Sequence, residues 1–480
     1  MTIGTTAAAA SPSAASAGHA AIERASSVAI GSWALLEWAG QPFYTLITTF
    51  LFAPYFANVF IGDPVKGQSL WGYAAAAAGL GVAIGTPILG AIADAGGRRK
   101  PWMLAMAVIM AAGMATLWLA APGATERTWI IVIAFVAAAF AAESIVMFAN
   151  AIMPTLVPAD QIGRLSGLGY AVGYLGGLLS LLIMVGLIVT NPATGKTLLG
   201  LDPLLQLDAA TRQGDRLVGP FCAVWFLVFM VPFFFFTPER NRMAAPAKPA
   251  RSRGLRAGLS DFGHTLRQLP RHRNILRFLI ARMLYADGLS AIFAFGGIYG
   301  ASVYGWQAFE QGLFGIILVV VGIVGAYAGG FLDDKFGPTT VIIASLLVII
   351  VGTIGILSID GTHVLFSIVV PVKAAGGAPF GSTGERVFLL FAVLIGMVAA
   401  PVGAASRSLM ARIAPPDKMT QFFGLFAFSG KVTAFLAPFA VAAVTQITGS
   451  QRAGVGIIAV FLLVGLVLML SVRAEPETAV

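Results

Sequence analysis

Cysteine and histidine are scarce in this chain of 480 residues. Cys222 is the single cysteine, so the chain can form no internal disulfide and no cysteine-based metal site. The four histidines fall outside the apolar segments, which argues against a buried histidine relay for protons: His19, His264, His272 and His363. The sequence also lacks a phosphate-binding loop and a nucleophile with its base. We therefore expect no enzyme, no catalytic residue, no metal and no cofactor.

Charge is scarce as well. Charged residues make up 11% of the sequence, against roughly 25% in a soluble domain, and the mean hydropathy is +0.87. A bilayer core needs about 20 apolar residues per helix. The apolar runs are continuous, which excludes the alternating strands of a membrane barrel. They predict an all-α membrane protein with twelve transmembrane helices, over 28–60, 70–95, 101–121, 129–154, 163–190, 217–237, 275–302, 307–333, 339–358, 387–410, 420–447 and 453–472.

The basic residues are unevenly distributed. With the N-terminus in the cytoplasm, 20 Lys and Arg fall on the inner side and 8 on the outer side. This positive-inside bias predicts that both termini are cytoplasmic, and it accounts for the net charge of +9 without nucleic-acid binding. Residues 1–27, rich in Ala, Ser and Thr, indicate a disordered cytoplasmic tail and not a signal peptide, and 474–480 a second cytoplasmic tail.

A loop motif occurs twice at half-length spacing. The pattern Gly-x3-Asp-x2-Gly begins at Gly90 and again at Gly330, which is 240 residues later. Such internal similarity indicates two related membrane halves. We expect pseudo-symmetric six-helix bundles over 28–237 and 274–473, joined by a basic cytoplasmic linker over 238–273.

A second repeat supports the two halves. The pattern Pro-x-Asp followed by Gly-Leu begins at Pro158 and again at Pro415, 257 residues later, each time ahead of an apolar segment. The halves therefore have parallel topology and are related by an axis along the membrane normal. They keep a scaffold but differ at two pairs of corresponding positions, Asn150 with Arg407 and Tyr174 with Lys431.

The loop motif predicts a conformational gate. Asp94 lies near the C-terminal end of its helix, where the helix dipole disfavours an anion. It therefore needs a partner, either a helix N-terminus of the other bundle or a nearby arginine. An ion pair that forms in one conformation and breaks in the other biases alternating access. The predicted gate consists of Gly90, Asp94, Gly97, Arg98, Arg99, Asp334 and Gly337, although the arginines would also serve topology alone.

Polar and ionisable side chains lie deep within the apolar segments. A charge in hydrocarbon costs upward of roughly 2.5 kcal/mol, so such residues usually face a cavity or a partner. Glu37 shares one helical face with Gln41, Tyr44 and Thr48. The alternative is that the acids and Lys431 pair permanently and only hold the bundles together. The predicted substrate- or proton-binding set is Glu37, Gln41, Tyr44, Glu143, Asn150, Tyr174, Asp287 and Lys431.

Several stretches resemble known transporters. Gly90–Arg99 resembles the loop between the second and third helices of the major facilitator superfamily. Trp33–Ala39, Tyr285–Gly288 and Ser406–Met410 resemble the vacuole-effluxer-like branch of that superfamily, whose eukaryotic members are linked to autophagy. The resemblance implies the major facilitator fold, alternating access between two bundles, and in eukaryotic relatives the export of amino acids from the vacuole. Glu37 departs from the Asp expected there.

These observations favour a secondary active transporter of a small polar organic solute. A cavity with Glu37 and Glu143 on one side and Lys431 on the other suits a zwitterion such as an amino acid, and desolvated Glu143 is the candidate carrier of a coupling proton. Drug or metabolite efflux, and a transporter-like sensor that does not transport, are the alternatives. The expected partners are the small-molecule substrate, protons and the lipid bilayer. We expect a monomer in a bacterial inner membrane.

Overall fold

The computed structural model describes residues 24–474 apart from 97, 191–194, 240–262, 264–266, 268, 305, 307, 373–378 and 435. Most of both predicted tails, most of the linker and Gly97 therefore lie outside the described residues. The regular secondary structure of the described residues is helical, apart from an isolated bridge between Thr190 and Thr197 and one antiparallel hairpin, in which β1 (His363–Val364) pairs with β2 (Ile368–Val369).

The first bundle contains six membrane segments. The first segment is interrupted and joins α1 (Ser27–Pro42), the π-helix η2 (Phe43–Phe50), α2 (Phe52–Tyr55) and η3 (Phe56–Phe60). The others are α3 (Pro64–Gly96), α4 (Lys100–Thr116), α5 (Thr128–Ile152), α6 (Ile162–Ile183) and α8 (Val218–Phe236), with the short α7 (Gln213–Arg216) before α8.

The second bundle repeats this order. It contains α10 (Arg273–Tyr304), α11 (Ala308–Phe336), α12 (Pro338–Leu357), α13 (Thr383–Ile413), the pair α14 (Met419–Ser429) and α15 (Leu436–Thr448), and α16 (Gln451–Met469). Ser382 caps α13 by accepting from the backbone N–H of Glu385, whose carboxylate returns to the Ser382 backbone. This capping box satisfies donors that a helix start leaves free.

Ten helices of the described chain are long and apolar enough to cross a membrane. The two remaining predicted spans are α10, which carries several charged residues, and the segment formed by α14 and α15. The prediction of one continuous helix over 420–447 is therefore wrong. The helix stops at Ser429 and resumes at Leu436, and turns occupy 430–434. We call residues 430–434 the break.

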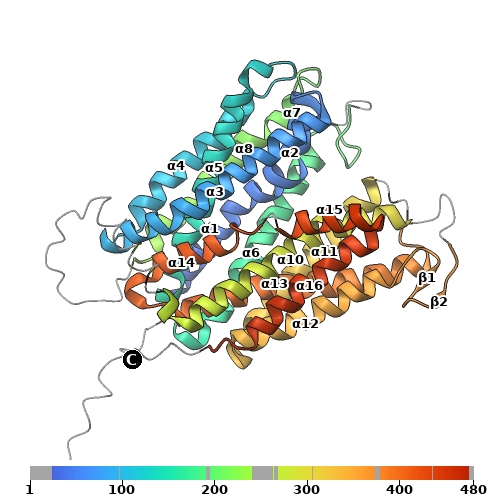
Figure 1. Ribbon diagram of the computed structural model, residues 1–480. Coiled ribbons are helices and arrows are strands. Elements are labelled where there is room, and N and C mark those ends of the chain that lie inside the picture. Colours follow the sequence, from blue (N-terminus) through green and yellow to red (C-terminus); the bar gives the residue numbers. More distant parts are fainter. Residues whose placement is uncertain are drawn as a thin grey trace, which may run out of the picture.

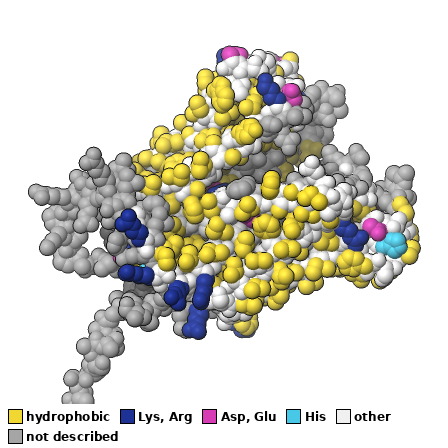
Figure 2. Space-filling model, in the orientation of Figure 1, with side chains coloured by type: hydrophobic (Ala, Val, Ile, Leu, Met, Phe, Trp, Pro, Cys, Tyr) yellow, Lys and Arg dark blue, Asp and Glu magenta, His cyan; other side chains and the backbone are white. Residues whose placement is uncertain are grey.

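The two bundles lie side by side and meet mainly through two helix pairs, α3 with α14 and α6 with α11, with further contacts of α6 with α13 and of α5 with α14. Figure 1 shows that they converge at one end and diverge towards the other. We call the converging end, where residues 98–100 and 269–273 lie, the linker end. The opposite end, with the segments 195–217 and 358–372, is the loop end. Figure 2 shows apolar side chains over the sides of both bundles and Lys and Arg gathered at the linker end.

The first segment changes its helix type at Pro42. Pro42 supplies no backbone N–H, which disturbs the regular hydrogen-bond ladder of α1, and a π-helix follows directly from Phe43. Insertions of this kind occur frequently at functional sites. Gln41 and Tyr44 flank this change, so the polar face predicted from regular helical spacing does not continue unchanged to Thr48.

Close packing at the linker end depends on Gly90 of α3. A Cβ atom added there would lie 2.7 Å from the carbonyl oxygen of Thr420 on α14. An alanine at Gly79 of the same helix would meet no atom within 4 Å. The two positions therefore form a matched pair, since both substitutions raise helix propensity by the same roughly 1 kcal/mol.

We expect Gly90→Ala to push α3 away from α14 and to open the linker end, whereas Gly79→Ala leaves it closed. Electron spin–spin distances between labels at the exposed positions Ala159 and Asp417, one on each bundle, measure this in a Cys222→Ser background. Longer distances are expected for Gly90→Ala only. Identical distance distributions for the two variants would show that this contact does not hold the linker end closed.

Candidate functional site

Asp94 caps a helix of the opposite bundle. Its carboxylate accepts a hydrogen bond from the backbone N–H of Gln421 at 2.9 Å and another from the hydroxyl of Thr420, in the first turn of α14. Arg99 lies 3.1 Å from the same carboxylate and donates to the Thr420 hydroxyl at 2.6 Å. Both kinds of partner expected for Asp94 are thus present, and the N-terminal dipole of α14 favours the anion.

Asp334 of the second bundle makes the equivalent contact with a helix of the first bundle. Its carboxylate accepts from the backbone N–H groups of Gly163 at 2.9 Å and Arg164 at 3.2 Å, in the first turn of α6. The Arg164 guanidinium adds an ion pair at 2.6 Å. Arg412 lies 3.1 Å from the neighbouring Asp333, which is buried.

The two contacts follow the two sequence repeats. Asp94 and Asp334 correspond in the loop motif, and Gly163 and Arg164 correspond to Thr420 and Gln421 in the second repeat. Each loop aspartate therefore binds the helix that begins with the second repeat in the other bundle. This crossed arrangement closes the linker end from both sides.

The remaining residues of the predicted gate differ in their positions and contacts. Gly337 has φ +82° and starts α12 directly after the loop, a conformation that favours glycine. Arg98 is exposed, so Arg99 alone of the two arginines reaches Asp94. Gly97 lies outside the described residues.

Arg407 of α13 forms the central contact between the bundles. Its guanidinium pairs with the Glu37 carboxylate and donates to the Asn150 side-chain oxygen at 3.2 Å. It also donates to the Ser166 hydroxyl at 2.9 Å and to the Ser166 carbonyl oxygen at 2.6 Å, and it stacks 4.7 Å from the Tyr170 ring. This one cation of the second bundle thus binds α1, α5 and α6 of the first bundle.

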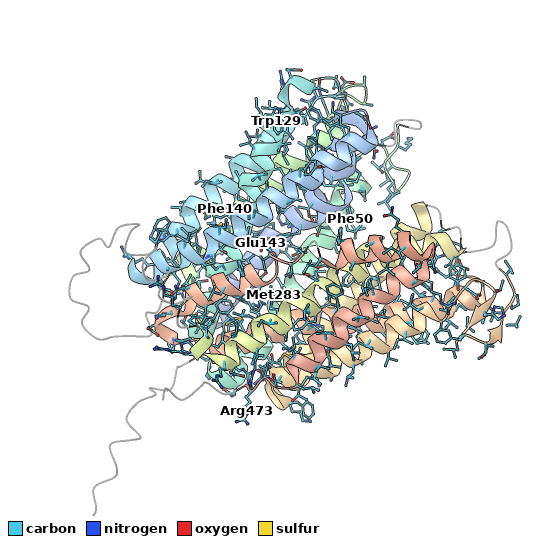
Figure 3. All side chains as sticks on the ribbon, in the orientation of Figure 1. Phe50, Trp129, Phe140, Glu143, Met283 and Arg473 are labelled. Atoms are coloured by element: carbon cyan, nitrogen blue, oxygen red, sulfur yellow. The ribbon has the colours of Figure 1, made fainter. Side chains whose placement is uncertain are left out.

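A second ion pair crosses between the bundles. Lys431 Nζ, in the break, lies 2.9 Å from a Glu143 carboxylate oxygen on α5. The Lys431 side chain is 38% exposed, against 3% for Arg407, whereas Glu143 and Glu37 are equally exposed at 18%. The Tyr44 hydroxyl is in hydrogen-bonding contact with Glu143. Figure 3 labels Glu143 at the level where the bundles begin to diverge.

Gln41 and Tyr174 flank this region without an ion pair. Gln41 lines a pocket inside the first bundle together with Glu37, Gly40 and Tyr44. Tyr174 packs its ring against the Tyr170 ring and close to Gly322 of α11, at the boundary between the bundles. Thr48 is absent from the pocket lining, because it lies beyond the change of helix type.

Asp287 of α10 differs from the other acids of the region. It is 1% exposed, and its Oδ2 atom has no hydrogen-bond partner among the described residues. The side chain of Thr433, in the break, lies beside it. Arg282, five residues earlier, instead donates to the Phe426 carbonyl oxygen and the Ser429 hydroxyl, at the end of α14.

A family model described as vacuole effluxer Atg22 like matches residues 55–478. The chain belongs to this Atg22-like family. It is 22% identical over 452 residues to an uncharacterised MFS-type transporter, YxiO of Bacillus subtilis, with 94% of this chain and 96% of that protein covered. It is 24% identical over 325 residues to autophagy-related protein 22 of Coccidioides immitis. That match covers 65% of this chain and 49% of the fungal protein, so the chain spans about half the fungal length.

Solved structures show the same fold. The proton:xylose symporter XylE superposes with a TM-score of 0.66 at 14% identity, covering 92% of this chain and 96% of the other. The Escherichia coli fucose:proton symporter FucP gives a TM-score of 0.64 at 15% identity, covering 92% and 97%. The Atg22-like chain therefore has the major facilitator fold and is a multi-pass membrane transporter, not an enzyme.

Sequence reasoning left several contact residues of this Atg22-like transporter out of the predicted set: Arg407, Ser166, Tyr170, Thr420, Arg164, Asp333 and Arg412. Arg407 lies near the inner end of its predicted span, 387–410, so the charge distribution groups it with the basic residues of the cytoplasmic side. Its correspondence with Asn150 in the second repeat is the sequence feature that indicates a site residue, because symmetry-related residues on facing helices can meet near the axis.

We expect Glu37→Gln and Arg407→Gln each to lower the melting temperature of the purified protein by several degrees. Removing one partner of a buried ion pair leaves an unpaired charge, at a typical cost of about 3–5 kcal/mol. The double variant should lose less than the sum of the single losses, because it removes both charges. Arg386→Gln, at the exposed start of the same helix, is the control and should change little. Strictly additive losses would show that the pair does not couple the bundles.

Proposed function

We propose that the chain is a proton-coupled secondary active transporter of a small zwitterionic solute, with an amino acid as the favoured class. The observation that carries this proposal is the partly exposed pair of Lys431 and Glu143 between the bundles. It offers one cation and one anion 2.9 Å apart where the bundles diverge.

An amino acid can replace this ion pair without leaving a charge unpaired. Its carboxylate would pair with Lys431 and its ammonium group with Glu143, so two ion pairs replace one. A hydrophobic amine would satisfy only Glu143, and a simple anion only Lys431. Because an unpaired charge at this depth is costly, the site supports zwitterions over both other classes. Tyr44 contacts Glu143, and it lines the neighbouring pocket together with Gln41.

The two ion pairs suggest different roles for the two glutamates. Glu37 is held by Arg407, which is 2% exposed and has four further contacts. This pair supports a role in joining the bundles. Lys431 is more exposed than Arg407, which supports a role in binding for the pair that it forms with Glu143.

We infer that the linker end faces the cytoplasm, because Lys and Arg gather there. In the conformation described, the Asp94 and Asp334 contacts close that end, so the site would open to the opposite side. Transport would require these contacts to break and the loop end to close. A bacterial inner membrane and a monomeric working unit complete the proposal.

The experiment is solute counterflow in proteoliposomes with a panel of amino acids, sugars, organic acids and hydrophobic amines. We expect exchange of an amino acid, and accumulation when a pH gradient is imposed. Lys431→Gln should weaken binding of that solute at least about tenfold, since losing one partner of a desolvated charge pair costs about 2 kcal/mol or more. Lys66→Gln, at an exposed lysine of the loop end, should leave binding unchanged. Counterflow of a sugar or a hydrophobic amine alone would contradict the proposal.

A further inference from the structure

Three acids lie at the depth of the site, and two of them are paired across the bundles. Glu37 pairs with Arg407, and Glu143 with Lys431. Asp287 has no such partner. We propose that Asp287, together with Thr433 of the break, forms the site that binds the coupling proton. The coupling of this proton to solute transport rests on the proposed function, whereas proton binding by Asp287 can be tested without transport.

Burial without a partner is the first argument. Asp287 is 1% exposed, and its Oδ2 atom lacks a hydrogen-bond partner in the described part of the chain. The hydroxyl of Thr433 is likewise buried without a partner, and its side chain lies beside the Asp287 carboxyl group. A carboxylate here would be a buried anion with one neutral hydroxyl beside it and no ion-pair partner among the described residues. A protonated carboxyl group can instead donate to the Thr433 hydroxyl.

The charged groups around Asp287 give the second argument. Arg282 is the nearest cation on α10, and it is engaged with the Phe426 carbonyl oxygen at 2.5 Å, with the Ser429 hydroxyl at 2.7 Å and with the Phe426 ring. The sequences of α14 and α15 contain no charged residue, and the one charge of α16 is Arg452 at its loop end.

The other two helices that pack against α10 also leave Asp287 without a counter-ion. On α13, Arg407 is engaged with Glu37 and the remaining charges lie near the ends. On α11, the charges likewise lie near its two ends. Lys431 of the break faces Glu143. In this conformation, therefore, no cation among the described residues forms an ion pair with Asp287.

The break connects this acid to the proposed substrate site. Lys431 and Thr433 are two residues apart in the same non-helical turn, and they contact opposite bundles, Glu143 and Asp287 respectively. Interrupted membrane helices often form ion and substrate sites, because their backbone can rearrange locally. A change at Asp287 is therefore transmitted to Lys431 through two or three residues.

The proton step follows from these contacts. When the Asp287 O–H bond breaks, the proton passes to water on the open side and the electron pair stays on the carboxylate. The new anion attracts Lys431, which lies two residues from Thr433 in the break. Lys431 then leaves the solute carboxylate, and the solute is released. Binding a proton reverses the order, which links one proton to one solute in either direction of flux.

A sodium ion fits the same place less well. Sodium needs several oxygen ligands, whereas the side chains here supply one carboxyl group and one hydroxyl. The Arg282 guanidinium on the same helix also disfavours a second cation nearby. Sodium binding is therefore an outcome that would overturn the proposal.

The first test is infrared difference spectroscopy of the purified protein in light and heavy water at neutral pH. We expect the C=O band of a protonated carboxyl group in the wild type and its loss in Asp287→Asn. Thr433→Val should shift this band, because the carboxyl group loses its acceptor, whereas Thr433→Ser should keep it. Asp360→Asn is the control. The Thr362 hydroxyl and the His363 backbone N–H lower the pKa of this exposed loop acid, so it stays ionised and contributes no such band.

The second test uses proteoliposomes with the solute identified by counterflow. Asp287→Asn mimics the protonated acid, so we expect counterflow to continue and accumulation driven by a pH gradient to be lost. A missing carboxyl band in the wild type, accumulation that persists in Asp287→Asn, or accumulation driven by sodium would each overturn the proton site. A band assigned to Asp287 in a protein that transports no member of the panel would instead refute the proposed function and leave the proton site standing.

Discussion

Arg407 is the charge on which the contact between the bundles depends. A guanidinium cannot be deprotonated within the membrane, so it must be surrounded by acceptors or an anion. All of its polar partners among the described residues lie in the first bundle: Glu37, Asn150 and Ser166. Separating the bundles at this level would strip the arginine of every one of them. The fold therefore cannot open at the linker end without new partners for Arg407, which makes this residue a natural point for solute or water to influence the conformation.

The linker-end contacts and the central ion pairs differ in their physical character. Asp94 and Asp334 use backbone N–H groups of helix starts, which are always present and need no particular side chain. These contacts are nearly symmetric and can form or break together. The central pairs use specific charged side chains and are asymmetric, with α13 and the break supplying the cations and α1 and α5 the anions. In the proposed transport cycle, a symmetric closure around an asymmetric centre would let the two bundles move as equals while the solute contacts each of them differently.

Most of the fold was predictable because its signals are local. Hydropathy marks each span, and the two repeats fix the parallel relation of the halves. The partners of Asp94 also followed from the helix dipole alone. What could be predicted only in part was which charge meets which: Glu37 and Glu143 were both set opposite Lys431, and Glu143 does pair with Lys431, whereas Glu37 pairs with Arg407. Pairing depends on helix rotation and tilt, and these change at Pro42 and at the break, where regular spacing no longer gives the direction of a side chain.

The correspondence of Asn150 with Arg407 explains why the centre is asymmetric. These residues occupy equivalent positions in the two halves, 257 apart, and they hydrogen-bond to each other at 3.2 Å. Equivalent residues that touch must lie near the axis relating the halves. Two arginines could not occupy this place together, because like charges would repel in a medium of low dielectric constant. One half must therefore carry a neutral acceptor where the other carries the cation. The internal duplication that builds this fold thus requires its two halves to diverge at the point where they meet.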